Sequence, residues 1–280
     1  MDVVDQIIKD FEERARNDPV LKSLKKTAGK KNASYSIAHR YAVQCNDILN
    51  SSIAKYAHKD DIELKREILS KLFGEGLSKE HDMISGVTEA IQKQINKEAK
   101  ISLKALKPKL DRDRIQGLTK HFVGNPYDTD VIDEVLLKKI HDFTENFSLN
   151  VVDDAIKDNA EFQSRAGLHA VIVRIASSDA CEWCANLAGV YDYEEVKETG
   201  NPVFLRHTRC TCEVTYKCDR DSTYLNVHDK KTTYSTEEMQ KRIAISRASN
   251  ERFYSLEEKQ KRLELHQALL NRRKKKSKAT

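Results

Sequence analysis

The sequence predicts an α+β protein in which helices dominate. Apolar residues recur at steps of three or four from the N-terminus to about Ala160, which is the period of one face of an α-helix. Near Gly167 this period changes to the alternation of a β-strand. Glycine and proline are scarce, with nine and four residues in 280, which favours long helices with few turns. We therefore expect a helical region over residues 1–164, a small α+β module over residues 165–220, and a charged, helical C-terminal extension over residues 221–280 that ends in basic residues.

Three segments carry the clearest helical stripes. The first covers about residues 34–58, the second runs from Ile84 to Leu106, and the third runs from Ile132 to Ala155. Pro108 is expected to end the second helix, because proline lacks the N–H that a helix interior needs. Stripes of this kind are far more often a core between helices than a binding surface. Cys45 lies on the first stripe and is predicted to be a small core residue.

The predicted α+β module contains four short strand candidates. They are HAVIVRIAS from His169, VYDY from Val190, PVFLR from Pro202 and CEVTY from Cys212. The first alternates most clearly, with three apolar side chains on one side. All four candidates, and four of the six cysteines, fall between His169 and Tyr216. We expect one compact piece of structure that contains the whole cysteine cluster.

Composition excludes some classes of protein. No run of about 18 apolar residues exists, so no membrane-spanning helix is expected. The start, MDVVDQIIKDFEERAR, is acidic and amphipathic and does not have the pattern of a signal peptide. We therefore expect the chain to be made in a reducing cytoplasm, where clustered cysteines more often hold a metal than form disulfides.

The net charge of +5 conceals an uneven distribution. From Glu237 onward there are 13 Lys or Arg against 6 Asp or Glu, a surplus of +7, so the part of the chain before Glu237 sums to −2. Such a basic tail binds polyanions or merely solubilises the end of the chain, and the pattern favours neither. The candidate nucleic-acid contacts in it are Arg272, Arg273, Lys274, Lys275, Lys276 and Lys278. An earlier basic stretch, KSLKKTAGKKN, is interpreted as a solvated loop in preference to a phosphate contact.

The cysteine cluster has the spacing of a metal site. Cys181 and Cys184 form a C-x-x-C pair, which lets one tight turn aim both thiolates at a single point. His207, Cys210 and Cys212 follow further along the chain, so five potential donors converge where a tetrahedral zinc ion needs four. Cys218 is a possible substitute for one of them. A structural zinc is the preferred interpretation; a redox pair at Cys181 and Cys184, disulfides and free thiols are the alternatives.

The sequence contains no recognisable catalytic constellation. Zinc deaminases use H-x-E followed by P-C-x-x-C, whereas here Ala180 precedes the first cysteine and the upstream histidine begins His169-Ala170-Val171. H-E-x-x-H, a phosphate-binding G-x-x-x-x-G-K-S/T loop and a G-x-S-x-G elbow are all absent. We therefore expect a protein that is not an enzyme.

The stretches CEWCANLAGVYDY and VFLRHTRCTCEVTY resemble the C-terminal module of the minor head proteins of tailed bacteriophages, the Mu F-like head-morphogenesis family. That family's C-x-x-C, short leucine–glycine segment and H-x-x-C-x-C fall here on the five donors and on Leu187 and Gly189; Thr208 stands where members often have proline. The resemblance implies a non-enzymatic virion protein of the capsid interior or portal vertex, acting in head assembly and in DNA packaging or ejection. The implied partners are capsid, portal or scaffold proteins, and packaged DNA.

Two other functions stay open at this point. One is a DNA-binding regulator that uses the cluster as a zinc finger, although the long gap between Cys184 and His207 does not match the usual finger and the intervening segment is acidic. The other is a zinc-dependent hydrolase or nuclease, which would need an open coordination position on the metal.

Overall fold

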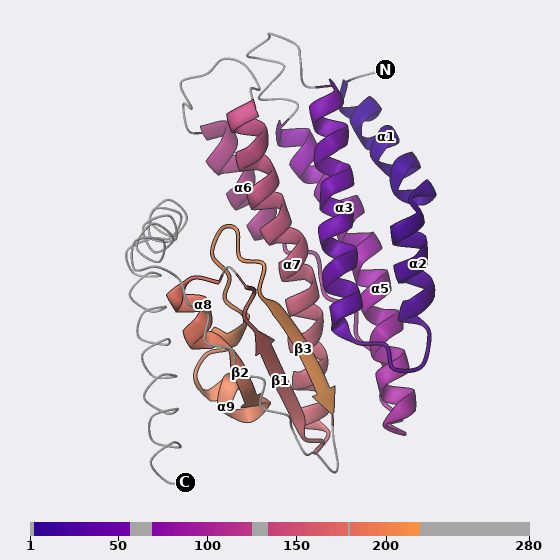
Figure 1. Cartoon of the computed structure of the whole chain (residues 1–280), viewed down its shortest axis with the longest axis vertical. Helices are drawn as coiled ribbons and strands as arrows, with labels where there is room; N and C mark the ends of the chain where they lie inside the picture. The colour runs from indigo at the N-terminus through magenta and orange to yellow at the C-terminus, as the bar shows by residue number, and fades with distance from the viewer. Residues whose placement is uncertain (1–2, 57–68, 125–133, 179, 219–280) are drawn as a thin grey trace. The chain divides into compact units, whose positions relative to one another are not determined.

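The computed structural model describes residues 3–56, 69–124, 134–178 and 180–218. The chain divides into two compact units, residues 1–158 and 159–280, and the boundary falls inside a long helix. Helices dominate the described residues and one small antiparallel sheet accompanies them, so the predicted α+β class is confirmed (Figure 1). No helix in the described part of the chain is long and apolar enough to cross a bilayer. The predicted C-terminal extension, with its basic end, lies outside the described residues.

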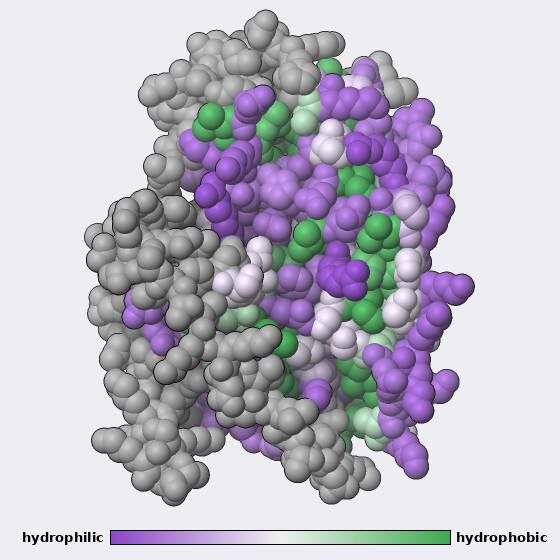
Figure 2. All heavy atoms as spheres, in the orientation of Figure 1, coloured by the Kyte–Doolittle hydropathy of each residue, from purple (hydrophilic) through white to green (hydrophobic). Residues whose placement is uncertain are grey.

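The first unit is built from helices that pack side by side. They are α1 (Val3–Asn17), α2 (Pro19–Ala28), α3 (Tyr35–Tyr56), α5 (Leu77–Glu98), α6 (Arg112–Gly124) and the first part of α7 (Glu134–Arg165), with one π-helical turn, η1 (Leu72–Gly76), leading into α5. Helix α3 packs against α1, α2 and α5. Hydrophilic side chains predominate along the edge formed by α1 and α2 (Figure 2).

Local sequence explains where α2 begins and which face of α1 is buried. Between α1 and α2, the Asp18 side chain accepts a hydrogen bond of 2.7 Å from the backbone N–H of Leu21. Pro19 occupies the first position of α2, where its missing N–H costs nothing. The apolar face of α1 includes Ile7 and Phe11, both fully buried. Burial of that face against α3, more than intrinsic propensity, stabilises a helix of this length.

A polar seam runs through the core of the first unit. The Asn50 side chain on α3 donates to Thr144 Oγ1 on α7 at 3.0 Å. One turn further along α7, Ser148 Oγ lies 2.7 Å from a carboxyl oxygen of Glu80 on α5. All four side chains are buried, so the core holds a connected set of hydrogen bonds between three helices. The apolar stripes of the sequence did not reveal this seam.

Helix α5 ends well before Pro108, so the predicted end of that helix was wrong. Lys100 adopts a left-handed conformation with φ of 54°, and the N–H of Ile101 bonds back to the carbonyl of Asn96 at 2.7 Å. The Asn96 side chain then donates to the Leu103 carbonyl at 3.0 Å. This backward bonding satisfies the last carbonyls of the helix and turns the chain away. The apolar residues beyond it are therefore in non-helical chain, in spite of their helical spacing.

The described part of the second unit centres on a three-stranded antiparallel sheet with strand order β2-β1-β3. The strands are β1 (Ala170–Ile175), β2 (Gly189–Asp192) and β3 (Glu213–Cys218), which confirms three of the four predicted strands. In the register, Ile172 pairs with Tyr191 on one side and with Tyr216 on the other. Two short helices, α8 (Glu182–Leu187) and α9 (Tyr193–Glu198), flank β2 in the chain.

The predicted strand PVFLR was wrong, because this segment forms a single 3-10 turn, η2 (Pro202–Phe204). Asn201 is left-handed with φ of 61°, and the N–H of Phe204 bonds to its carbonyl at 3.2 Å. Pro202 has no N–H to offer to a neighbouring strand, which disfavours a place in the sheet. The carbonyl of Val203, within the turn, and that of Leu205, just after it, accept hydrogen bonds from Arg174, which lies beside the cysteine cluster.

Candidate metal centre

The first two sulfur donors are placed by the start of α8. Cys181 is the N-cap residue of that helix and Cys184 lies in its first turn. The N–H of Ala185 bonds to the Cys181 carbonyl at 2.9 Å, which closes the turn and brings the two cysteines to one side. Both side chains are buried. The C-x-x-C spacing therefore produces the turn that the sequence predicted.

The other three donors come from the segment that leads into β3. The N–H of Cys210 bonds to the carbonyl of His207 at 3.1 Å, and Arg209 between them is left-handed with φ of 63°. This second tight turn aims the His207 ring and the Cys210 thiol at α8. Cys212 follows just before the strand begins and is also buried.

The structure brings all five predicted donors together around Cys184. Two sets of three could each hold a metal ion, namely Cys181, Cys184 and His207, and Cys184, Cys210 and Cys212; within each set the ligand atoms lie within 4.8 Å of one another. Cys184 Sγ lies 3.0 Å from His207 Nε2 and 3.5 Å from Cys210 Sγ. Cys181 Sγ lies 3.4 Å from the same Nε2. Cys184 thus belongs to both sets.

These separations fit a tetrahedral ion. Two thiolates on one zinc lie about 3.8 Å apart, and a thiolate and an imidazole nitrogen about 3.5 Å apart, as metal–ligand distances of about 2.3 and 2.0 Å in a tetrahedron require. The observed values of 3.5 Å between sulfurs and 3.0–3.4 Å between sulfur and nitrogen are slightly shorter. A displacement of a few tenths of an ångström would accommodate an ion. The residues therefore fit a metal ion that prefers sulfur and nitrogen ligands in tetrahedral geometry.

The tautomer of His207 also suits a metal ligand. Its Nδ1 lies 2.6 Å from the carbonyl oxygen of Thr208, which can only accept a hydrogen bond. Nδ1 therefore carries a proton, so Nε2 is the nitrogen left for a metal ion, and it faces the sulfurs of Cys181 and Cys184. Histidines that ligate a metal commonly donate from the other ring nitrogen to a backbone carbonyl in this way, which fixes the orientation of the ring. The Trp183 ring packs edge-on against His207, with ring centroids 5.7 Å apart.

Two buried arginines surround the sulfur cluster, and sequence analysis missed both. Arg174 on β1 is 1% exposed and its guanidinium donates to the carbonyls of Val203 and Leu205, at 2.5 and 3.0 Å. The same group lies 3.3 Å from Cys210 Sγ and 3.8 Å from Cys184 Sγ. Arg206, also buried, donates to the carbonyls of Cys210 and Cys212 at 3.1 and 2.7 Å.

These arginines supply positive charge where thiolates accumulate. Arg174 makes no ion pair with any carboxylate of the described residues, so the sulfurs are the anionic groups that it faces. A buried cation needs a partner, and a thiolate-rich metal site needs positive charge to offset its own. The available signal in the sequence was a lone arginine inside an otherwise apolar strand, HAVIVRIAS.

The cluster shifts the pKa values of its thiols in opposite directions. Hydrogen bonding from Cys184, assisted by His207, lowers the pKa of Cys181 to about 4. Hydrogen bonds from Cys184 and Cys212, with the charges of the two arginines, hold the pKa of the Cys210 thiol well below its usual range. The pKa of Cys184 is raised, because it is the thiol that donates to its neighbours. Thiolates are therefore favoured at Cys181 and Cys210 even before an ion is considered.

The remaining predictions have simpler outcomes. Cys45 is fully buried on α3 among apolar residues, as predicted for a core residue. All described cysteines are free thiols. The side chain of Cys218 and the six basic residues from Arg272 to Lys278 lie outside the described residues.

Fold and site together define a helical protein with a small sheet module whose Cys/His cluster could hold a metal ion. A family model described as VG15 protein matches residues 26–242, which is well over half of the chain. The chain therefore belongs to the VG15 protein family, a family of phage gene products. No curated protein and no solved structure matches the chain.

Proposed function

We propose that this phage protein is a minor head protein of the virion, which acts in head assembly and in DNA packaging or ejection without catalysing a reaction. Two observations support the proposal. The VG15 match covers the whole Cys/His module and most of the helical unit. In addition, the five Cys and His residues of the resemblance to Mu F-like minor head proteins converge in one cluster, in which the four cysteines are buried, as a shared structural module requires.

In this proposal the cluster holds a structural zinc ion. Four of Cys181, Cys184, His207, Cys210 and Cys212 would bind it, and the ion would cross-link α8 to the segment before β3. The four cysteines are buried, which favours a closed site with no position for a reacting water. The sheet has strands of only six, four and six residues, and a module of this size buries too little surface to be more than marginally stable. Binding energy at a structural site adds directly to folding and would supply what the sheet lacks.

The helical unit would provide surfaces for capsid, portal or scaffold proteins. The basic tail, from Arg272 to Lys278, would touch packaged DNA by neutralising phosphates, a contact that is independent of sequence and weakened by salt. The protein would be made in the host cytoplasm and would end in the capsid interior or at the portal vertex.

Replacement of the shared donor tests the zinc and the head together. Cys184→Ser removes a ligand from both three-donor sets, whereas the matched control Cys45→Ser removes a buried cysteine far from the cluster in sequence. Elemental analysis of purified chains should give one zinc per wild-type or Cys45→Ser chain and a loss of zinc from Cys184→Ser. Phage produced with wild-type protein should carry it in filled heads.

Other results would overturn the proposal. Protein found only in the host cytoplasm, with binding to a specific promoter, would establish the regulator instead. Hydrolysis of a nucleic acid or peptide that depends on bound zinc and is lost in Cys184→Ser would establish an enzyme. Equal zinc content in Cys184→Ser and wild type would refute the assignment of the metal site.

A further inference from the structure

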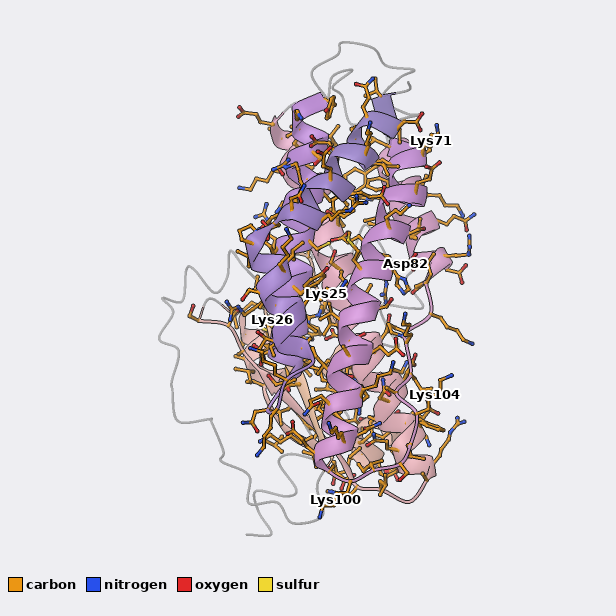
Figure 3. The ribbon with its side chains drawn as sticks, turned by 90° about the vertical axis from the view of Figure 1, so that its right-hand side faces the viewer. Lys25, Lys26, Lys71, Asp82, Lys100 and Lys104 are labelled. Atoms are coloured by element: carbon orange, nitrogen blue, oxygen red, sulfur yellow. The ribbon has the colours of Figure 1, made fainter. Side chains whose placement is uncertain are left out.

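The helical unit presents a face of lysines that the sequence did not bring together. We call it the lysine face and define it by seven exposed side chains from α2, the loop after it, the end of α5 and the chain beyond it: Lys25, Lys26, Lys30, Lys31, Lys97, Lys100 and Lys104. Figure 3 shows four of them, Lys25 and Lys26 on one side of α5 and Lys100 and Lys104 beyond its end and on its other side. Two segments that are far apart in the chain therefore carry lysines on the side of the unit that faces the viewer in Figure 3, on either side of α5.

A direct contact joins the two segments. The backbone N–H of Asn32, in the loop after α2, donates to Glu98 Oε1 at the end of α5 at 2.8 Å. Below this contact, Tyr35 at the start of α3 donates from its hydroxyl to Gln92 Oε1 on α5 at 2.7 Å, with both side chains buried. Helix α2 also packs against α5. The spacing of the lysines on the face is thus fixed by well-packed elements.

The lysine face carries almost no compensating charge. Residues 19–34 contain five lysines and no acidic residue. In residues 93–109, Lys93 and Lys107 pair with Glu89 at 2.6 and 3.3 Å and are not part of the face, and the one acidic residue of the segment is Glu98. That glutamate already accepts the Asn32 N–H and the Gln94 side chain. Elsewhere on the unit the pattern differs: Lys55 pairs with Asp10 at 2.6 Å and Lys79 with Glu12 at 2.8 Å.

Lys100 gives a second, independent observation. It occupies the left-handed position that ends α5, with φ of 54°, where glycine or asparagine is the usual residue. A side chain with a Cβ costs about 1 kcal/mol or more in this conformation. A glycine would avoid this cost, so the lysine is kept for its positive charge, which suits both the C-terminus of the helix and the end of the face.

Charge and chemistry identify the partner as a phosphate backbone. Lysines are point charges on flexible stems, which suit phosphates spread along a strand, and such contacts carry no sequence information. A protein partner would normally require a buried apolar or aromatic anchor at the centre of the interface. The large exposed apolar side chains of the described residues are Val20, Val135 and Ile175, and none belongs to the face.

We propose that the lysine face binds the phosphate backbone of duplex DNA, independently of the basic tail. The proposal deepens the proposed function, because it uses the same partner, but it assigns a second contact on a different part of the chain. Each lysine that neutralises a phosphate displaces a condensed counterion, so binding should weaken steeply with salt.

The test compares two full-length variants of equal net charge. The face variant carries Lys25→Gln, Lys26→Gln, Lys100→Gly and Lys104→Gln. The control variant carries Lys55→Gln, Lys71→Gln, Lys79→Gln and Lys138→Gln, which are outside the face. Each set lowers the formal net charge from +5 to +1. Lys100→Gly also relieves the left-handed position, so this change should not impair folding.

Each set of substitutions is made in two backgrounds, the wild-type chain and a chain whose six basic tail residues are replaced by Gln. Affinity for a random-sequence 30-base-pair duplex is measured by fluorescence anisotropy at several salt concentrations. The face variant should lose about tenfold or more in affinity, and its slope of log K against log salt should fall by up to about 3.6, at about 0.9 for each phosphate contact. The control variant should change less than about threefold.

Three outcomes would overturn the proposal. The control variant could lose as much affinity as the face variant, which would reduce the effect to net charge. The face variant could bind like the wild type in both backgrounds. Poly-glutamate of matched charge could bind the wild type as tightly as the duplex, which would assign the face to acidic protein. None of these outcomes bears on whether the protein and its zinc occur in filled heads, so failure here is separable from failure of the proposed function.

Discussion

Removal of the Arg174 charge should destabilise the second unit and weaken its hold on a metal. Arg174→Met keeps the apolar stem but deletes the guanidinium, which bonds to the carbonyls of Val203 and Leu205 and contacts two sulfurs. The two carbonyls lose their buried charged donor, at about 1–3 kcal/mol each. We therefore expect a loss of about 2–6 kcal/mol in the free energy of unfolding. We also expect about 10–100-fold weaker zinc binding, as is typical when a ligand loses a supporting group.

Two measurements check this expectation. Urea unfolding followed by the fluorescence of Trp183, the single tryptophan, reports the stability of the module, because that ring lies against the arginine and the histidine. Competition with a chromophoric chelator reports zinc affinity. Arg174→Lys is the matched control: it keeps the charge but has no planar fork, so it should recover part of the zinc affinity and less of the stability.

A free energy of unfolding for Arg174→Met within about 1 kcal/mol of wild type would refute this prediction, because an average point substitution costs as much. The prediction also fails if Arg174→Met and Arg174→Lys lose zinc affinity equally, since charge would then play no part. A variant that loses stability but keeps its zinc affinity would limit the arginine to a structural role.

Three further predictions concern the helical unit. Burial raises the pKa of Glu80 from 4.5 to about 8, so its contribution to stability is fully present below about pH 4.5 and is lost as the pH rises to about 8. The free energy of unfolding should therefore fall by at most about 5 kcal/mol over this range. Glu80→Gln should abolish the fall in urea titrations at pH 5–8, and an unchanged pH profile would contradict the prediction. Lys100→Gly should raise the free energy of unfolding by about 1 kcal/mol, because glycine tolerates the left-handed conformation, and a loss of stability would show that the lysine makes a stabilising contact. Tyr35→Phe should cost about 1–3 kcal/mol, because Gln92 loses a buried hydrogen bond; a thermal midpoint equal to that of wild type would refute this.

The surroundings of Glu80 explain why the free energy of unfolding should fall as the pH rises. Ser148 Oγ lies within hydrogen-bond distance of both Glu80 and the carbonyl of Thr144, and a hydroxyl has one proton to donate. Donation to Glu80 lowers the pKa of the carboxyl, but complete burial raises that pKa by more, and the second carboxyl oxygen is buried with no hydrogen-bond partner among the described residues. The uncharged carboxyl is therefore the form that the core accommodates, and ionisation is what costs free energy.

The sequence by itself determined the helices with strong apolar stripes, three of the four strands and the five Cys and His residues that meet in one cluster. These features depend on local rules, namely the helical and strand periods and the short spacings of C-x-x-C and H-x-x-C. The same rules were wrong for the end of α5 and for PVFLR. In both cases a left-handed residue, Lys100 or Asn201, started a turn that apolar spacing does not encode.

Only the tertiary structure decided which groups surround those donors and which charges gather on one surface. Arg174 reaches the sulfurs because β1 is the central strand, and the two lysine segments of the face meet because α2 packs against α5. Glu80 meets Ser148 across 68 positions of the chain. The physical reason is common to all three: burial and electrostatic interaction depend on distance in space, and residues far apart in a sequence acquire that distance only when the chain is packed.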